Sequence, residues 1–317
     1  MMRAATRKAY GKSGIITVES IPKPTIKANQ VLVQIYNSSL NSWDLDHLHG
    51  SMWVIKLGKF LPILGADISG KVIQIGPKVT TLKVGDEVFG DISGMNFGGL
   101  AEYIAVDENL LAIKSSKITF EQAASLPQAG VLALQGIKMK NDLKSNDKVL
   151  INGAGGGVGT IALQILKHIG VEITCVDRPD KFEFLKELGA THCIDFQTID
   201  YTTQGVCYDL ILDLFAFNPL NSYSKCLTEN GSFVLIGGKV SNALQLMVLS
   251  AFKNPKLKVV VHQPKKEDLQ ELQEMMEQGK IVPLIEKTFK LDDINDAFAY
   301  YESGEFKGKI AITIFTP

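Results

Sequence analysis

The stretch from Asn152 to Gln164 reads NGAGGGVGTIALQ, and its first half is mostly glycine. Glycine loses more conformational freedom on folding than any other residue, so such a run needs a reason. A glycine-rich turn between a strand and a helix lets a pyrophosphate approach the free N–H groups of the helix's first turn. The spacing G-x-G-x-x-G fits with alanine in first place, and a merely tight strand–helix turn is the alternative. The predicted binding residues are Ala154, Gly156, Gly157, Val158 and Gly159.

An acidic residue, Asp177, follows the next apolar run, VEITCV. A carboxylate in this place would bind the ribose hydroxyls of an adenosine and repel a 2′-phosphate. Arg178 and Lys181 follow directly and would attract that phosphate. The two interpretations nearly cancel, and a helix N-terminal role for Asp177 stays open beside them.

Two further segments end apolar runs that are typical of parallel strands. YDLILDLF ends in Asp213, Leu214 and Phe215, and GSFVLIGG ends in Gly237 and Gly238. Because the carboxyl ends of parallel strands meet at one edge of a sheet, where ligand crevices lie, we expect both segments to reach the cofactor.

The elements that must position these residues change in kind along the chain. The first third alternates apolar and polar residues between glycine turns, which predicts a β-rich region. Strand–helix units follow, with helices predicted at 121–139, broken at Pro127, at 158–169 and at 180–189. Two amphipathic helices, at 265–280 and 291–304, and a closing strand at 308–315 come last. The pattern predicts a parallel-sheet domain, 123–262, inserted into a discontinuous β domain, 1–122 and 263–317.

Composition excludes several classes of function. The 317 residues carry a formal net charge of -1, which argues against a general nucleic-acid binder. No apolar run approaches the roughly 20 residues of a membrane span. The N-terminal residues lack the apolar core of a secretory signal, so we expect a cytoplasmic protein. The four cysteines show no spacing typical of a zinc site.

Several motifs occur in a fixed order along nearly the whole chain. They read NSSLNSWDLDHLHG, PILGADISGKVIQIG, VGDEVFG, GGLAEYIAV, AASLPQAGVLALQ, GAGGGVGTIALQ, LKELGATHCIDF and GKIAI. In these the chain resembles the medium-chain dehydrogenase/reductase superfamily, in its zinc-independent quinone oxidoreductase (zeta-crystallin-like) branch. The resemblance implies an α/β protein with a GroES-like β-rich catalytic domain and an inserted Rossmann domain with a doubly wound parallel sheet.

The zinc alcohol dehydrogenases of this superfamily use an early cysteine and a Gly-His-Glu segment. Here Asn41 takes the place of the cysteine, and Gly65-Ala66-Asp67 takes the place of the segment. An amide and a methyl group cannot replace thiolate and imidazole as zinc ligands. His47 and His49 are nearby, but two histidines do not make a site. We therefore expect no catalytic metal.

The resemblance implies hydride transfer from a nicotinamide to a quinone or to the β-carbon of an enone. NADP(H) is favoured by the family habit and by the Arg178/Lys181 pair, and NAD(H) stays possible. Asn41 would line the substrate cleft and donate to a carbonyl, or merely form a turn. Asp44 matches an acidic family position of less clear role.

Two more residues come from the resemblance. Gln128 opens the segment Gln128-Ala129-Gly130, whose glycine would admit the nicotinamide, and Lys309 resembles a family lysine near the cofactor, with a surface charge as its alternative. Relatives are often homodimers joined by strand addition. Two other functions stay open: metal-free alcohol or aldehyde oxidoreduction, and a cofactor-binding protein with a structural or RNA-binding role.

Overall fold

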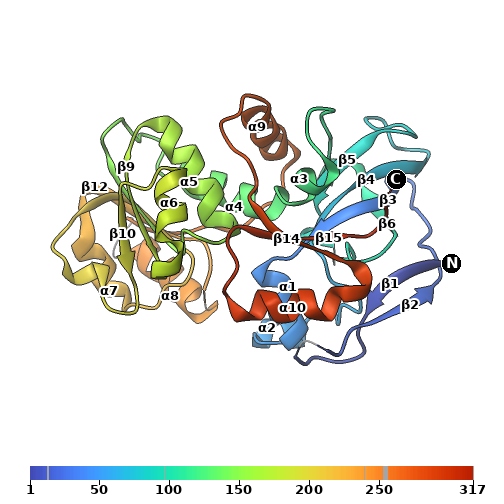
Figure 1. The fold of residues 1–317 in the computed structure, drawn as a ribbon, viewed down its shortest axis with the longest axis horizontal. Coiled ribbons are helices and arrows are strands. Elements are labelled where there is room, and N and C mark those ends of the chain that lie inside the picture. The colour runs from blue at the N-terminus through green and yellow to red at the C-terminus, as the bar shows by residue number, and fades with distance from the viewer. Residues whose placement is uncertain (13, 96, 239, 253–255, 317) are drawn as a thin grey trace. The chain divides into compact units, whose positions relative to one another are not determined.

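The computed structural model divides the chain into two units, one of which interrupts the other in sequence (Figure 1). It describes residues 1–12, 14–95, 97–238, 240–252 and 256–316. One unit comprises Met1–Val131 and Gln263–Pro317, and the other Leu132–His262. The first boundary falls inside helix α4 (Pro127–Lys138). Domain limits at 122 and 262 stay a prediction, because packing alone does not test independent folding.

The unit Leu132–His262 is built on a parallel sheet. The described part of this unit forms six strands in the order β10-β9-β8-β11-β12-β13. Chain order reverses between β8 and β11, which is the doubly wound arrangement and places the ligand crevice at their carboxyl ends. The predicted parallel sheet is confirmed. The strands are β8 (Lys148–Asn152), β9 (Glu172–Asp177), β10 (His192–Asp195), β11 (Tyr208–Asp213), β12 (Leu227–Leu235) and β13 (Leu257–Val259).

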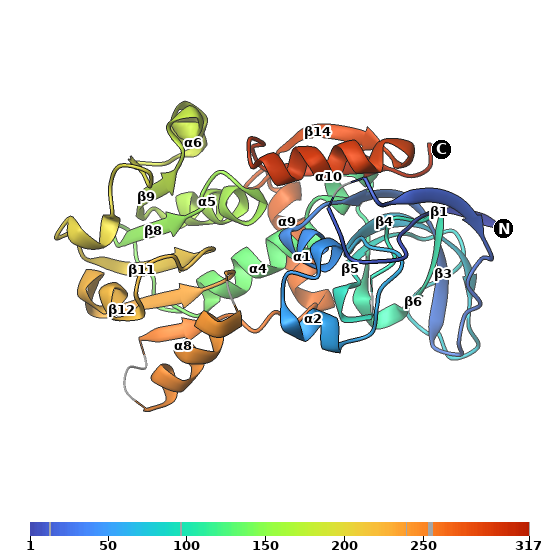
Figure 2. The same ribbon diagram turned by 90° about the horizontal axis from the view of Figure 1, so that it is seen from below.

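Helices cover this sheet. Helix α5 (Gly157–Ile169) packs against β8 and β9 (Figure 2). Gly170 ends it in the left-handed conformation at φ 85°. Tyr223 and Leu246 share a buried cluster with Leu150 and Phe233 of the sheet. The other helices of the unit are α6 (Phe182–Leu188), α7 (Leu220–Tyr223) and α8 (Val240–Phe252).

The other unit is built on an antiparallel-rich sheet. In the described residues its order is β14-β15-β3-β4-β5-β7, with β6 pairing with β3. The closing strand β15 pairs antiparallel with β3, so the prediction that the chain's end rejoins the N-terminal β region is confirmed. Strands β1 (Met2–Thr6) and β2 (Thr17–Ile21) pair separately. The sheet strands are β3 (Gln30–Ser39), β4 (Asp67–Ile75), β5 (Glu87–Asp91), β6 (Tyr103–Asp107), β7 (Leu111–Ile113), β14 (Ile285–Lys290) and β15 (Lys309–Thr313).

Two helices of this unit, α1 (Ser42–His49) and α2 (Trp53–Leu57), were not predicted from the sequence. Asn41 precedes α1, and the Asp44 carboxylate accepts a hydrogen bond from the Asn41 backbone N–H at 2.9 Å, which is one half of a capping box. Gly50 ends α1 at φ 58°. The helices are α1 (Ser42–His49), α2 (Trp53–Leu57), α3 (Phe120–Ala124), α9 (Lys266–Glu277) and α10 (Ile294–Ser303).

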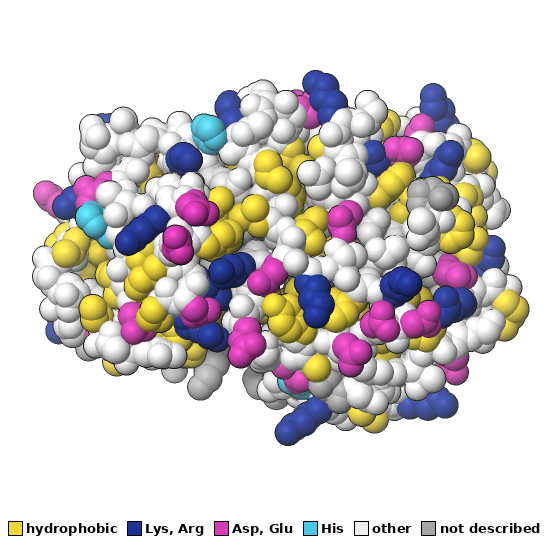
Figure 3. Space-filling view, viewed as in Figure 1, with side chains coloured by type: hydrophobic (Ala, Val, Ile, Leu, Met, Phe, Trp, Pro, Cys, Tyr) yellow, Lys and Arg dark blue, Asp and Glu magenta, His cyan; other side chains and the backbone are white. Residues whose placement is uncertain are grey.

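The surface carries charge of both signs. On the face drawn in Figure 3, Lys and Arg side chains lie among Asp and Glu side chains. In the part of the chain that the structure describes, no helix has the length and apolar character that crossing a membrane requires.

Candidate active site

The glycine-rich turn joins β8 to α5 and leaves the start of the helix open. Gly156 precedes the helix in extended backbone, and a Cβ placed on it would meet nothing closer than the Gly153 carbonyl oxygen at 3.8 Å. A Cβ on Gly159 would come within 2.4 Å of that same oxygen. Gly159 is therefore needed for close packing of helix on strand, and Gly156 keeps a path clear to the N–H groups of Gly157 and Val158. Both features fit a pyrophosphate.

Asp177 ends β9 and braces the turn. Its Oδ2 accepts a hydrogen bond from the Gly155 N–H at 2.6 Å, and its Oδ1 accepts one from the Arg178 N–H at 2.9 Å. The buried Lys181 ammonium lies 3.8 Å from Oδ1. A Cβ on Gly155 would lie 2.5 Å from Lys181 Cδ. The carboxylate and the lysine thus hold the turn in shape, a role that neither sequence interpretation of Asp177 included.

Arg178 is the more exposed cation at this edge. Its Nε lies 2.9 Å from Asp180 Oδ1, and both side chains are partly open to solvent. An exposed ion pair of this kind contributes little to stability, so Arg178 can exchange Asp180 for another anion.

Asp213 shapes the turn that follows β11. It is fully buried, and its Oδ1 accepts hydrogen bonds from Asn152 Nδ2 at 2.9 Å, the Phe215 N–H at 2.9 Å and the Ala216 N–H at 2.8 Å. Tyr201 donates its hydroxyl to Oδ2 at 3.1 Å. The carboxylate therefore organises protein groups, and direct contact with a cofactor stays a prediction for Asp213.

The turn itself reaches the switch point of the sheet. The Phe215 ring lies so close to Gly153 that a Cβ there would come within 2.6 Å of it. Phe217 is 72% exposed and stacks on Phe215, with ring centroids 5.3 Å apart. A Cβ on Gly237 would lie 2.4 Å from the Leu214 carbonyl oxygen, and a Cβ on Gly238 would lie 2.5 Å from the Phe215 carbonyl oxygen. Neither position therefore has room for a side chain. The two predicted segments therefore do meet at the carboxyl edge.

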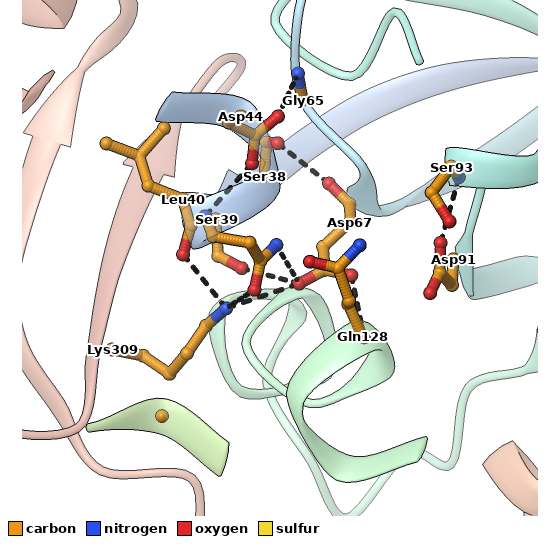
Figure 4. Close-up of polar contacts among 12 residues, drawn as sticks. Ser38, Ser39, Leu40, Asp44, Gly65, Asp67, Asp91, Ser93, Gln128 and Lys309 are labelled. Carbon is orange, nitrogen blue, oxygen red and sulfur yellow. Dashed lines mark hydrogen bonds and ion pairs between the residues drawn. The ribbon is translucent and has the colours of Figure 1, made fainter. Parts of the chain in front are cut away.

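The other unit holds a buried polar network around Asp67 and Lys309 (Figure 4), and Asn41 belongs to it. Lys309, at the start of β15 and only 3% exposed, donates to Asn41 Oδ1 at 2.6 Å and to the Leu40 carbonyl oxygen at 3.0 Å. Asn41 Nδ2 donates to Asp67 Oδ2 at 2.9 Å, and the same oxygen lies 3.3 Å from the Lys309 ammonium. The orientation of the Asn41 amide is thereby fixed. The surface alternative for Lys309 is wrong.

Asp67, the first residue of β4, is fully buried. Besides Asn41 and Lys309, its carboxylate accepts hydrogen bonds from Ser39 Oγ at 2.9 Å and from the Gln128 backbone N–H at 2.8 Å. Burial raises the pKa of Asp67, and the ammonium of Lys309 opposes that rise. Gln128 thus contributes its main chain to this network at the start of α4.

Asp44 lies on α1 with no exposure to solvent. Its two oxygens accept from the backbone N–H groups of Asn41 at 2.9 Å and Gly65 at 2.8 Å. Burial raises the pKa of Asp44 to about 7, against the opposing effect of these two hydrogen bonds. Asp44 joins the start of α1 to the segment before β4, and so positions Asn41 from the main chain.

Comparison with known proteins decides the family. A model described as alcohol dehydrogenase GroES-like domain matches residues 27–116, and one described as zinc-binding dehydrogenase matches 188–312. The 2-methylene-furan-3-one reductase of Solanum lycopersicum is 33% identical, over 98% of this chain and 79% of that protein. The chain belongs to the medium-chain dehydrogenase/reductase superfamily, in its quinone oxidoreductase branch.

Two further relatives of this branch are similar over nearly the whole chain. The NADPH-dependent alkenal/one oxidoreductase of Arabidopsis thaliana is 30% identical, over 98% of this chain and 79% of that protein. The solved structure of the quinone oxidoreductase from Coxiella burnetii matches with a TM-score of 0.91 at 30% identity, covering 99% of each chain. The predicted combination of a GroES-like domain and a Rossmann domain is confirmed.

The superfamily includes zinc enzymes, so the donor set needs a test. Where those enzymes carry metal ligands, this chain places Asn41, Ala66 and Asp67, and the Lys309 ammonium lies 2.6 Å from Asn41 Oδ1. A fixed positive charge at that point repels a divalent cation, and an amide and a methyl group are poor zinc ligands. The residues present do not fit zinc. Among the described side chains, no group of three His, Cys, Asp or Glu could hold a metal ion.

Asp67 is the residue that sequence reasoning missed. Asp67 is the acidic residue of the segment that replaces Gly-His-Glu. No local sequence pattern links it to Asn41 or to Lys309, which is 242 residues away. A lysine that opens a strand and an acid that opens another are the only local signals, and both are common on protein surfaces.

Proposed function

We propose that the protein transfers a hydride from NADPH to a quinone or to the β-carbon of an α,β-unsaturated carbonyl compound. The observation that carries this proposal is the Asn41 amide, fixed by a buried ammonium and a buried carboxylate. The names of the relatives agree with this proposal, since they describe reductases of an alkenal or enone, of a methylene-furanone and of quinones.

The chemistry asks little of the protein beyond placement and charge. A bound NADPH supplies the hydride, and with one proton from solvent the acceptor becomes a hydroquinone or a saturated carbonyl compound. Asn41 Nδ2 carries two hydrogens, and one of them forms the hydrogen bond to Asp67 Oδ2. The other donates to the acceptor's carbonyl oxygen, where negative charge develops.

Lys309 strengthens that donor. Its ammonium binds Asn41 Oδ1 at 2.6 Å, which draws electron density out of the amide and makes the Nδ2 protons better donors. In a zinc dehydrogenase the metal polarises the carbonyl directly. Here the positive charge of Lys309 acts on the acceptor's carbonyl only through the Asn41 amide. This weaker polarisation suits acceptors that are already electron-poor.

For the cofactor, we propose that the turn Ala154–Gly159 receives the pyrophosphate and that Arg178 binds the 2′-phosphate of NADPH. Asp177, which otherwise repels that phosphate, has its carboxylate turned to Gly155 and lies beside Lys181. Leu214, Phe215, Gly237 and Gly238 would border the same ligand at the carboxyl edge.

An acceptor screen tests the function. Oxidation of NADPH and of NADH is followed at 340 nm with a simple quinone, an enal and a saturated aldehyde. We expect turnover with the first two acceptors, faster with NADPH, and an Asn41→Ala variant that loses turnover while binding NADPH normally. Turnover with the aldehyde alone, or tight NADPH binding with no turnover, would favour one of the two alternative functions instead.

We also propose a homodimer joined at β13, one of the two edge strands of the described parallel sheet, whose outer backbone groups would extend the sheet into a second copy. Light scattering that gives a monomer mass contradicts this.

The cytoplasmic location stays a prediction, since relatives are named as chloroplastic and as mitochondrial.

A further inference from the structure

Two phenylalanine rings are open to solvent on the turn that follows β11. Phe217 is 72% exposed and Phe215 is 46% exposed, and their rings lie parallel within 7°, with centroids 5.3 Å apart. These two side chains form the ring platform. A contiguous exposed apolar surface is typical of a place that a ligand or partner covers. The proposed function so far gives Phe217 no role.

The turn that carries the ring platform is held in a strained shape. Ala216, between the two rings, has φ 51°, in the left-handed region that residues other than glycine seldom adopt. The buried Asp213 carboxylate accepts from the N–H groups of Phe215 and Ala216, and Asn242 Nδ2 donates to the Ala216 carbonyl oxygen at 2.9 Å. Strain of this kind persists only where the surrounding structure enforces it, and it clusters at binding sites.

The backbone N–H groups of this turn are already used inside the protein. Asp213 binds two of them. The N–H groups of Leu214 and Asn218 donate to the Asn152 carbonyl oxygen at 3.2 Å and to the Tyr223 hydroxyl at 3.1 Å. What the turn offers to a ligand is therefore the flat apolar face of a ring. The natural partner of such a face is another flat ring.

The ring platform borders the glycine-rich turn. The Phe215 ring packs so closely over Gly153, the first glycine of that turn, that a Cβ there would lie 2.6 Å from it. Strand β8 lies between β9 and β11 in the sheet. Neighbouring strands are about 4.8 Å apart, which places the ends of β9 and β11 about 10 Å from each other. A nucleoside whose ribose lies beside Arg178, just after β9, therefore reaches across β8 to the ring platform with its base.

We propose that the ring platform binds the adenine of NADPH by stacking, chiefly through Phe217, and that it recognises the face of the base and not its edge. This rests on the proposed function. The nicotinamide fits the platform less well, because its carboxamide needs hydrogen-bond partners and one of its faces must stay open to the acceptor. Every base has a π-face, so binding by stacking tolerates changes at the edge of the base.

Calorimetric titration with two ligands tests the stacking. One is NADPH, and the other is adenosine 2′,5′-bisphosphate, which carries the adenine and the 2′-phosphate without a nicotinamide. We expect Phe217→Ala to raise both Kd values about tenfold, as loss of one base–aromatic stack does. Phe217→Tyr keeps a flat ring and should stay within about twofold of the wild type. Phe217→Leu keeps apolar volume without a π-face and should show most of the loss.

A change at the edge of the base tests the mode of recognition. Reduced nicotinamide hypoxanthine dinucleotide phosphate has an oxygen in place of the adenine amino group and keeps the flat bicyclic ring. We expect its Kd to lie within about threefold of that of NADPH, because stacking on an apolar ring does not depend on that group. A larger increase would show that the edge is recognised and would overturn this part of the proposal.

Phe315→Ala is the matched control. Phe315 is a phenylalanine of the other unit, 39% exposed, and its removal should leave both Kd values unchanged. Urea unfolding checks that the variants are folded, which we expect because Phe217 is mostly exposed. A normal Kd for NADPH in folded Phe217→Ala, or an equal loss in the two alanine variants, would overturn the proposal. Weaker binding of NADPH alone, with normal binding of adenosine 2′,5′-bisphosphate, would overturn the assignment to adenine.

The same variants separate this inference from the function beneath it. Wild-type protein that binds neither ligand would refute both. Oxidation of NADPH by a quinone, with a normal Kd in Phe217→Ala, would refute the inference and leave the function standing. A Kd that depends on Phe217, in a protein that oxidises NADPH with no acceptor, would refute the function and leave the ring platform standing.

Discussion

At the scale of single residues, the notable feature is a buried ion pair between Asp67 and Lys309. Asp67 and Lys309 are both buried, and their attraction alone rarely repays the loss of hydration. Here Ser39, Asn41, Leu40 and Gln128 supply further hydrogen bonds to the pair. The network therefore fixes one side chain, Asn41, more than it stabilises the fold.

Asp44 gives a test through pH. Its carboxyl group keeps its proton up to about pH 7 in the folded protein, whereas a free aspartate loses it near 3.8. The folded state therefore binds more protons between these values, and this group's contribution to stability falls as pH rises through that window.

We expect Asp44→Asn to lower the free energy of unfolding by about 1–3 kcal/mol, because one amide oxygen cannot accept from both Asn41 and Gly65. We also expect it to reduce the stability difference between pH 5 and pH 8, measured by urea unfolding. An unchanged difference would show that Asp44 is ionised throughout.

Arg178 gives a test of cofactor choice. Arg178→Ala should raise the Kd of NADPH about tenfold or more and leave that of NADH within twofold, because a charge-assisted contact to the 2′-phosphate is lost. Asp180→Asn is the matched variant, since it frees Arg178 from its ion pair and should tighten NADPH binding. Equal losses for the two nucleotides in Arg178→Ala would remove the role.

At the scale of elements, the candidate site residues of each unit lie where an element begins. Helix α5 begins at the glycine turn, α1 begins beside Asn41, and β15 begins with Lys309. Starts of elements leave backbone groups and side chains unpaired by the element itself, which makes them available for binding.

Gly156→Val tests the start of α5. The extended backbone at Gly156 accepts valine, and the new side chain would enter space with no atom within 3.8 Å of its Cβ. We therefore expect a folded variant whose NADPH affinity drops at least tenfold, measured by fluorescence titration. Gly156→Ala should show a smaller loss. A folded valine variant with normal affinity would contradict the assignment of the turn.

Elements were predictable where their signal is local. The strand, glycine turn and helix around 148–169 follow from periodicity and glycine placement, and Pro127 marks the start of α4 as expected. Helix α1 was missed because its sequence, SWDLDHLH, has little apolar periodicity and is held by contacts from Asn41 and Gly65. Strand β13 extends only over Leu257–Val259, although the apolar run continues to Val261.

The site was predictable only in parts. The resemblance pointed to Asn41 and Lys309, and the structure brings them together. The bracing roles of Asp177 and Asp213 depend on backbone N–H groups whose positions no spacing rule gives.

At the scale of the whole molecule, the same superfamily fold serves chemistry with zinc and without it. The difference lies in a few positions, where Asn41 and Ala66 stand and Lys309 brings a fixed charge. A fold therefore indicates the hydride donor more surely than the acceptor.

Metal analysis tests this difference. We expect purified protein to contain no stoichiometric zinc and to keep full activity after treatment with a strong chelator, because its donor set does not fit the ion. One zinc per chain, with activity lost on chelation and restored by zinc, would mean that the network around Asn41 opens to a metal.

The central claim is that a hydride passes from the nicotinamide to an electron-poor acceptor. It is tested most directly with NADPH in which both hydrogens at C4 of the nicotinamide are deuterium and with a simple enone, by locating the label in the product. The account predicts deuterium at the β-carbon of the saturated ketone, with the α-hydrogen taken from solvent. Deuterium at the carbonyl carbon of an alcohol product, or no transfer of label at all, would contradict it.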